Sequence, residues 1–490
     1  MGFVSQLSAV LQWDLMLMMV GSVLFGLIIG ILPGVGGSVA IALLIPITFG
    51  LDPKASIVVL LSAYGASAMG GSLTSILINT PGDAVNAATA FDGYPLAQQG
   101  KAGMAITASM VSSVLGGLLG LMALDLMIPV SRKLILMFSY PDFFMLAVFG
   151  MTVIAVITRG NTFRGVLSAL FGLLLAFVGT DPIMGNDRFT FGIEYLWDGV
   201  DLLSVIIGFF AVTEAYTLSR QYESISGEIK VKSGISWDGV KAVFQHFWLF
   251  LRSCFIGFYT GVIPGVGGIV GSFMAYGTAV QMSKSPERFG KGAIEGVIAV
   301  ESANEAREGG HLLPTLAFGI PASASMAILI GGLMMHGISP GPEMLTKDIN
   351  LTYFLIATAV VSKFVAMILG LLLGTRMVFV TKIRGSLMAP AIIVIALVGA
   401  YGVGGKMGDV IATAVFGFLG VLMQKYGYSR VSLIIALVLG KLVEASYHQS
   451  MTTFGVSGFF TRPIALALLL LIVGSLVWPF IRKKKVRVKP

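Results

Sequence analysis

The octapeptide Gly30-Ile-Leu-Pro-Gly-Val-Gly-Gly37 recurs, with two conservative changes, as Gly261-Val-Ile-Pro-Gly-Val-Gly-Gly268. Each copy lies in a long apolar run and is followed by a second glycine-rich segment that proline interrupts, at residues 70–82 and at residues 309–321. Proline removes a helical hydrogen bond, and glycine weakens a helix further. The sequence therefore predicts two internal repeats, each with two broken or re-entrant helices.

The composition is that of a membrane protein. Of the 490 residues, 56% are hydrophobic and only 11% are charged, whereas soluble domains contain about 25% charged residues. Apolar runs of roughly 20 residues, the length that crosses a bilayer, recur from residues 15–32 to residues 464–480. These runs lack the two-residue alternation of barrel strands, so the predicted fold class is an all-α polytopic membrane protein.

The positions of the repeats and of the charged segments predict the organisation of the chain. We expect a first transmembrane repeat over residues 1–218, a linker over 219–245, a second repeat over 246–450, a C-terminal span over 451–481 and a basic tail over 482–490. The linker and the tail are rich in basic residues, which predicts that both are cytoplasmic. An odd number of spans in each repeat, and hence inverted topology, follows from this placement.

Two further observations bear on the topology and on the net charge. Inverted repeats would place Arg132 and Lys133 outside the cell, and parallel repeats reverse that conflict, so parallel repeats remain the alternative. The net charge of +8 arises largely from the tail. A basic tail after a last span indicates topology and contact with lipid headgroups, and we expect no nucleic-acid partner.

The broken helices predict a site for an anion. Unwinding in the middle of the membrane leaves backbone N–H groups at the start of a half-helix, where the helix dipole supplies about half a positive charge. Such ends bind carboxylates without a buried arginine. The alternative is that the glycines only allow close helix packing. The predicted substrate-binding residues are Pro33, Gly34, Gly36, Gly37, Ser72, Thr74, Asn79, Thr80, Pro81, Gly82, Pro264, Gly265, Gly267, Gly268, Gly319, Pro321, Ser323 and Ser325.

Ionisable and amide side chains near the breaks predict a site for a coupling ion. Asp83 follows the first broken segment, and a carboxylate inside a membrane is a functional candidate, although it could instead cap a helix at the membrane surface. Glu301 and Asn304 share one helical face, while Glu305 and Arg307 are expected at a solvated helix end. The candidates for binding H⁺ or Na⁺ are Asp83, Asn86, Glu301 and Asn304.

Other classes of function have weaker support. The segment Gly337-Ile-Ser-Pro-Gly341 has the spacing of a hydrolase nucleophile elbow close to His336, but Pro340 makes a poor elbow. No Gly-Lys pair precedes Ser or Thr, so the chain lacks a P-loop, and an ion gradient is the expected energy source. The single cysteine, Cys254, excludes an intramolecular disulfide. We expect no enzyme activity and no metal or organic cofactor; a passive channel or a structural scaffold remains the alternative.

The chain resembles the large membrane subunit of the tripartite tricarboxylate transporters. The resemblance rests on the doubled Pro-Gly-Val-Gly-Gly motif, on Asn79-Thr-Pro-Gly82 and Ala88-Thr-Ala-Phe-Asp-Gly-Tyr-Pro95, and on Gly319-Ile-Pro-Ala-Ser-Ala with His336-Gly-Ile-Ser-Pro-Gly-Pro342. It covers most of residues 20–345.

This resemblance implies a multi-pass permease of the bacterial inner membrane, driven by protons or sodium. It also implies two partners, a small membrane subunit and a periplasmic solute-binding protein that delivers an organic di- or tricarboxylate. The family often has glycine where this chain has Ala322, and small or amide residues where it has Arg307 and Glu308. These departures leave the identity of the carboxylate open.

Overall fold

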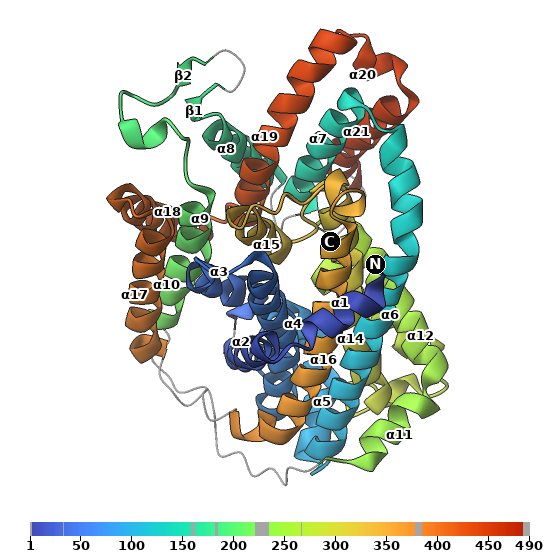
Figure 1. Cartoon of the computed structure of the whole chain (residues 1–490). Coiled ribbons are helices and arrows are strands. Elements are labelled where there is room, and N and C mark those ends of the chain that lie inside the picture. Colours follow the sequence, from blue (N-terminus) through green and yellow to red (C-terminus); the bar gives the residue numbers. More distant parts are fainter. Residues whose placement is uncertain are drawn as a thin grey trace, which may run out of the picture.

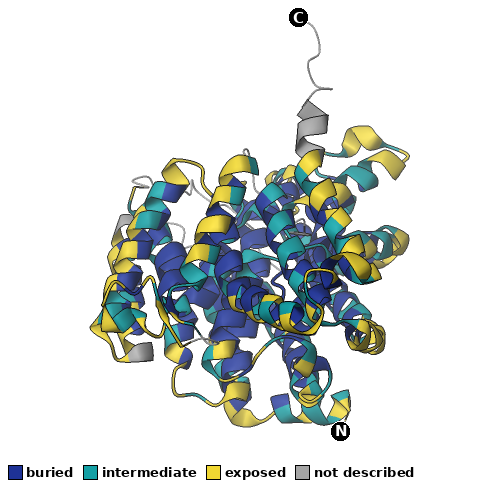
Figure 2. Ribbon diagram, turned by 90° about the horizontal axis from the view of Figure 1, so that it is seen from above, coloured by how far each residue is buried: buried dark blue, intermediate teal, exposed yellow. Residues whose placement is uncertain are grey.

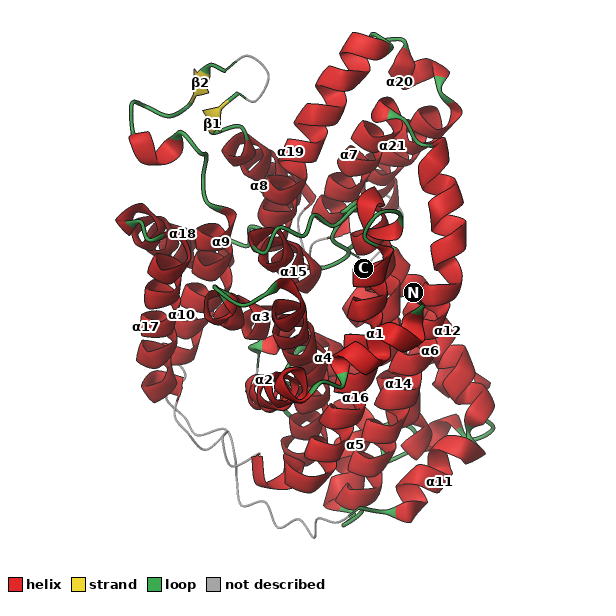
Figure 3. Cartoon of the chain, viewed as in Figure 1, coloured by secondary structure: helices red, strands yellow, loops and turns green. Residues whose placement is uncertain are grey.

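The computed structural model describes residues 2–32, 34–157, 162–181, 185–220, 235–265, 267–377 and 385–483. Within these ranges, two short strands, β1 (Gly179–Thr180) and β2 (Asp187–Arg188), pair in an antiparallel hairpin, and every other element is a helix (Figure 3). Arg188 holds the hairpin against the second half of the chain through an ion pair with Glu444, at 2.6 Å.

The helices occur in the following order along the chain. The first half of the chain forms α1 (Phe3–Val10), α2 (Trp13–Ile31), α3 (Gly36–Thr48), α4 (Pro53–Ile78), η1 (Ala84–Asn86), α5 (Ala87–Gln98), α6 (Ala102–Met137), α7 (Tyr140–Ile157), α8 (Thr162–Ala176), η2 (Glu194–Leu196), α9 (Leu202–Ile206), η3 (Ile207–Val212) and α10 (Thr213–Ser219). The second half forms α11 (Trp237–Gln245), α12 (Phe247–Val262), α13 (Gly267–Met282), η4 (Pro286–Arg288), α14 (Ile294–Phe318), α15 (Ala324–Met335), η5 (Pro342–Leu345), α16 (Ile349–Met377), α17 (Gly385–Gly404), α18 (Met407–Lys425), α19 (Arg430–Thr453), α20 (Gly458–Thr461) and α21 (Pro463–Lys483).

Length and composition mark seven helical segments as candidate membrane spans. They are Trp13–Ile31, Pro53–Ile78, Ala102–Met137, Leu202–Ser219, Ile349–Gly374, Met407–Lys425 and Arg430–Thr453. Shorter apolar helices, such as α3, α12 and α15, lie among them. The predicted class, an all-α polytopic membrane protein, is confirmed.

Helices α4 and α14 form the centre of the molecule (Figure 1). α4 packs against α2, α3 and α16, and every residue from 55 to 77 is buried. α14 packs against α12, α13 and α6, and it too is buried along most of its length, although it is far richer in charged residues. Exposed residues lie on the outer helices, around this buried interior (Figure 2).

The two halves contact each other reciprocally. α6 of the first half packs on α14, and α16 of the second half packs on α4. The short helices do the same, because α1 packs on α16 and α11 packs on α6. Two repeats that each place one helix against the central helix of the other repeat would make reciprocal contacts of this kind. The repeats, their inverted topology and the predicted boundaries stay predictions; residues 221–234 of the linker and 484–490 of the tail lie outside the described residues.

Candidate functional site

The first glycine motif forms a turn between α2 and α3. α2 ends at Ile31, and α3 begins at Gly36. Gly34 has a φ of 79°, a left-handed conformation that glycine adopts without strain, and its N–H donates to the carbonyl oxygen of Gly82 at 2.8 Å. Pro33 lies outside the described residues. This hydrogen bond joins the break between α2 and α3 to the break that follows α4.

The second glycine motif forms the corresponding turn between α12 and α13. α12 ends at Val262, and α13 begins at Gly267. Gly265 also has a φ of 79°, and its N–H donates to the carbonyl oxygen of Ala322 at 2.9 Å. Gly34 and Gly265 therefore adopt the same left-handed conformation and make the same kind of bond to the second broken segment of their own half.

The second broken segments also end and restart in the same way. α4 ends at Ile78 and is followed by Asn79, with a left-handed φ of 55°, while α14 ends at Phe318 and is followed by Gly319, with a left-handed φ of 67°. After each break a polar residue, Asp83 or Ser323, starts the next helix, and its side chain accepts a hydrogen bond from the backbone of that helix. All four predicted breaks are therefore interruptions between two helices.

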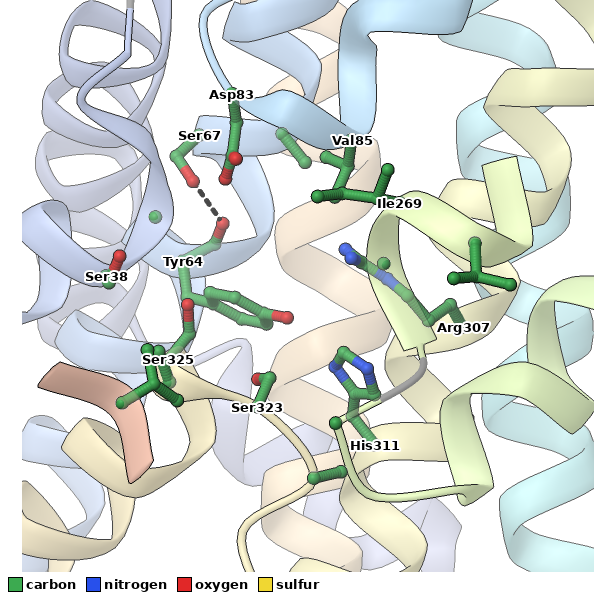
Figure 4. A pocket seen from close by; sticks show the side chains of 18 of the residues that line it. Ser38, Tyr64, Ser67, Asp83, Val85, Ile269, Arg307, His311, Ser323 and Ser325 are labelled. Carbon is green, nitrogen blue, oxygen red and sulfur yellow. Dashed lines mark hydrogen bonds between the residues drawn. The ribbon is translucent and has the colours of Figure 1, made fainter. Parts of the chain in front are cut away.

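A cavity of about 470 Å³ lies where these breaks meet (Figure 4). Its wall contains the start of α3 at Gly37, the start of α13 at Gly268, and Ala322 in the second turn. Polar side chains come from both halves of the chain: Ser38, Tyr64, Ser67, Asp83, Arg307, His311, Ser323 and Ser325. Residues that are more than 200 positions apart in sequence thus surround one space.

Arg307 places a positive charge in the wall of the cavity. Arg307 is only 6% exposed, and its Nε donates to the carbonyl oxygen of Asn304 at 3.2 Å. Among the described residues no carboxylate lies within ion-pair distance of its guanidinium group, which extends toward the cavity (Figure 4). A buried arginine without an acidic partner is a strong recognition element for a carboxylate, because its planar group donates two parallel hydrogen bonds.

The expectation that Glu305 and Arg307 lie at a solvated helix end is wrong. Both residues are in the middle of α14, which runs for 25 residues, and both are buried. The reason is tertiary: α6, α12 and α4 cover this segment from three sides, and its charges face protein groups or the cavity instead of water.

His311 lies one helical turn after Arg307 and also faces the cavity (Figure 4). The residue is 1% exposed, and neither ring nitrogen has a hydrogen-bond partner among the described residues. Buried polar groups normally have partners, so the ring nitrogens of His311 and the guanidinium group of Arg307, which has no acidic partner among the described residues, remain able to bond water or a polar ligand in the cavity.

Asp83 stands on the wall across from Arg307 (Figure 4). Its Oδ1 accepts a hydrogen bond from the N–H of Ala84 at 2.6 Å, so the carboxylate starts η1. Gly36 leaves room for the second carboxylate oxygen, because a side chain at Gly36 would collide with Asp83 Oδ2. Asp83 therefore caps a short helix and also lines the cavity, and its role in ion coupling stays a prediction.

The comparison with known proteins agrees with these motifs. Residues 15–435 match the Tripartite tricarboxylate transporter TctA family. The chain belongs to this family. It is 35% identical over 472 residues to a protein of Agrobacterium vitis named "Uncharacterized 52.8 kDa protein in TAR-I ttuC' 3'region", over 95% of this chain and 94% of that protein. A second protein of Agrobacterium vitis, "Uncharacterized protein in TAR-II ttuC' 3'region", is 36% identical over 230 residues, 46% of this chain and 95% of that protein. No solved structure matches the chain.

The predicted resemblance to the tripartite tricarboxylate transporters is thereby confirmed, and this TctA-family chain is a multi-pass component of a membrane transporter. Of the predicted substrate-binding residues, those that line the cavity are Gly37, Gly265, Gly268, Ser323 and Ser325. Those that form the turns beside it are Gly34, Gly36, Asn79, Thr80, Pro81, Gly82, Pro264, Gly267, Gly319 and Pro321.

The other predicted polar residues lie away from the cavity wall of the TctA-family chain, in a buried network. Ser72 donates to Glu301 at 2.8 Å, and Asn86 donates to Ser72 at 2.8 Å. The hydroxyl group of Thr74 donates within its own helix, to the carbonyl oxygen of Gly71 at 3.1 Å. Both polar atoms of the Asn304 side chain are buried without a partner among the described residues. Asn86 and Glu301 are therefore linked through Ser72, whereas Asp83 lines the cavity.

The sequence analysis missed a buried lysine of this TctA-family protein. Lys363 lies in the middle of α16, and its Nζ forms ion pairs with Glu305 and Glu308 of α14. A lysine inside a 29-residue apolar helix is a signal that could have been used, because charged residues in spans face the protein interior and are functional candidates. The hydroxyl groups of Ser38 and Tyr64, by contrast, carry no such signal.

The hydrolase alternative finds no support in the geometry of the TctA-family chain. Ring nitrogen Nδ1 of His336 is 2.8 Å from the carbonyl oxygen of Gly332, and Nε2 is 2.9 Å from that of Thr48. Both nitrogens are thus engaged by the backbone, and Ser339 is exposed on the following loop. A nucleophilic serine requires a base within hydrogen-bond reach, and His336 is held elsewhere.

Proposed function

We propose that this chain is the large permease subunit of a tripartite secondary transporter that imports an organic di- or tricarboxylate across a bacterial inner membrane. One observation carries the proposal: Arg307, buried and without an acidic partner among the described residues, faces a cavity at which the broken helices of both halves meet. Membership of a family of tripartite transporters supports the same function.

The cavity offers a carboxylate three kinds of interaction. Arg307 supplies a full positive charge and paired N–H donors. The starts of α3 and α13, which are 13 and 16 residues long, line the same space, and a helix start carries free N–H groups and the positive end of the helix dipole. Hydroxyl groups of Ser38, Ser323 and Ser325 are placed to bond further oxygen atoms of the substrate.

Transport then follows the alternating-access scheme. A site between two halves of a transporter opens to either side when one half moves against the other, while the broken helices keep the substrate contacts. In the proposed cycle the periplasmic solute-binding protein delivers the carboxylate, and the small membrane subunit completes the complex. The chain itself catalyses no reaction and needs no cofactor beyond the coupling ion. Its C-terminus is proposed to be cytoplasmic.

An ion gradient, of H⁺ or Na⁺, is the proposed energy source. Of the four predicted coupling residues, Asp83 faces the cavity, Asn86 and Glu301 share the buried network, and Asn304 has a free amide in the interior. These placements support two regions for an ion, one beside the substrate and one along α14. A passive channel remains distinguishable, because it would never accumulate substrate above the outside concentration.

The test compares uptake by wild type, Arg307→Ala and Arg307→Lys in cells that express all three subunits. The solute is the one that co-purifies with the binding protein and is identified by mass spectrometry. Removing a charged hydrogen-bond donor should weaken binding about 10- to 100-fold, with a smaller loss for lysine. Arg288→Ala is the control, because Arg288 is on the surface beside Glu295. Uptake by Arg307→Ala at the wild-type level and apparent affinity would refute the proposed site.

A further inference from the structure

Three charged side chains form a buried triad beside the cavity. Lys363 of α16 bonds to Oε2 of Glu305 and to Oε2 of Glu308, both on α14. The side chains are 1%, 0% and 7% exposed, respectively. Gly117 of α6 makes room for the lysine chain, since a side chain there would meet Lys363 Cε at 3.1 Å.

The charges of the triad do not balance. One ammonium group faces two carboxylates, and an unmatched charge in a buried place is very unfavourable. The second oxygen of each carboxylate, Glu305 Oε1 and Glu308 Oε1, is buried and has no hydrogen-bond partner among the described residues. A protonated carboxyl group would remove the excess charge and would supply a donor to a site that has only unpaired acceptors.

Among the described residues, Lys363 is the cation within ion-pair distance of Glu305 and Glu308, and no second cation pairs with either carboxylate. α4 contributes Tyr64 and Gly65, and α6 contributes Gly117. On α14 itself the nearest charges are Glu301, one turn before Glu305, and Arg307, whose guanidinium group extends into the cavity.

We propose that Glu305 and Glu308 share one exchangeable proton at Lys363, and that this proton is the coupling ion of the transporter. The shared proton is inferred from the triad alone, whereas its role as the coupling ion rests on the proposed function. Both carboxylates bond to the same ammonium group, so the proton belongs to the pair and not to one residue.

The position of the triad links the proton to the substrate. Tyr64 lines the cavity, and a side chain at the adjacent Gly65 would lie 3.4 Å from Lys363 Nζ and 3.7 Å from Glu308 Oε2. Glu308 also follows Arg307 directly on α14. A carboxylate that binds to Arg307 brings negative charge near the triad and therefore favours its protonated form. By linkage the proton favours carboxylate binding to the same degree, which is the sign required for co-transport in one direction.

Infrared spectroscopy of the purified full-length protein tests the proton without transport. Only a protonated carboxyl group gives the carboxylic C=O stretching band, so wild type should show this band at neutral pH. In Glu305→Gln or Glu308→Gln, one carboxylate remains for one ammonium group, and the band of the shared proton should be lost. In Lys363→Met the band should grow, because two carboxylates then lack a cation. Glu295→Gln, at the start of the same helix, is the control and should leave the band unchanged.

Two outcomes would overturn the shared proton. One is a wild-type spectrum without a carboxylic band at neutral pH, which decides the matter even if a variant fails to fold. The other is an unchanged band in both folded glutamine variants.

Transport assays then test coupling. In liposomes with the partner subunits, a panel of labelled citrate, succinate and malate is offered with and without a pH gradient. Glu308→Gln should retain exchange of the solute that wild type transports and lose accumulation driven by the pH gradient. Accumulation at the wild-type level would overturn the coupling role, whereas absence of solute exchange in wild type would count against the proposed function and leave the infrared result intact.

Discussion

Helices α4 and α14 are followed by the same kind of break, but their side chains differ. Each is followed by a left-handed residue, at Asn79 or Gly319, and by a turn whose carbonyl oxygen accepts a bond from a motif glycine. α4 carries one charged residue, Lys54, in its first turn, whereas α14 carries Arg307 and a set of carboxylates in its middle. The backbone frame of the cavity is therefore common to both halves, while the buried charges of these two central helices lie on α14 alone. Substitutions in the turns should therefore mainly lower stability, whereas substitutions of the charged side chains should mainly change transport.

The largest effect is expected where the two turns differ by one methyl group. Gly82 and Ala322 provide the carbonyl oxygens that bind the two motifs, but a side chain at Gly82 would lie 1.9 Å from the carbonyl oxygen of Gly30. Gly82→Ala should therefore destabilise the protein by more than about 3 kcal/mol, since backbone atoms cannot move aside easily. Ala322→Gly should cost about 1 kcal/mol. Thermal unfolding of the detergent-purified proteins measures both.

This pair of variants also tests whether the first turn is packed as tightly as described. Similar, small shifts of the melting temperature in Gly82→Ala and Ala322→Gly would show that the backbone at Gly82 has room for a side chain. The carbonyl oxygen of Gly30 in α2 would then lie farther from Gly82 than the structure places it.

A smaller effect is expected at the two glycines with the same φ. Gly34→Ala and Gly265→Ala both force alanine into a left-handed conformation, which costs about 1–2 kcal/mol. A side chain at Gly34 would meet no atom within 4 Å, whereas one at Gly265 would lie 3.0 Å from Ile154 Cγ1. The stability loss should thus be larger at Gly265. Gly100→Ala, in an exposed turn with a φ of 77° and open space, measures the conformational cost alone.

Thermal unfolding of the three alanine variants orders these costs. If Gly34→Ala lost more stability than Gly265→Ala, the first motif would be under constraints that its open surroundings do not explain, and the two turns would not be equivalent.

The contrast between frame and charge also explains what the sequence could predict. The breaks were visible because glycine and proline act locally: the doubled motif marks both turns, and the apolar runs mark the helices. The burial of Arg307 was not visible, because it depends on which helices cover the middle of α14. Its local pattern, with charges at Glu301, Glu305 and Glu308, is also that of a solvated helix end.

The partner of those carboxylates is equally remote in the sequence. Lys363 follows Glu308 by 55 positions and lies on another helix, so no spacing rule connects them. Only the general rule that a lysine in an apolar span has a buried partner could have pointed to it.

The smallest effect on stability is expected at the residues that start the helices after the breaks. Ser323 Oγ accepts a hydrogen bond from Met326 N–H at 3.3 Å and caps the 12-residue helix α15, so Ser323→Ala should cost about 1 kcal/mol. Asp83 starts only the three-residue η1, and asparagine keeps the accepting oxygen, so Asp83→Asn should cost less. Thermal unfolding measures both shifts.

In transport assays the larger effect is expected for Asp83→Asn and the smaller for Ser323→Ala, which reverses their order in stability. Asp83→Asn removes a negative charge from the wall across from Arg307, so a carboxylate should bind more tightly, by a few-fold, as expected when a like charge is removed from a partly buried site. Ser323→Ala removes one neutral donor and should weaken binding slightly. If the triad carries the coupling proton, Asp83→Asn should still accumulate substrate under a pH gradient. Loss of accumulation with exchange retained would instead assign the coupling ion to Asp83, and the charge that drives transport would then belong to the first half of the chain.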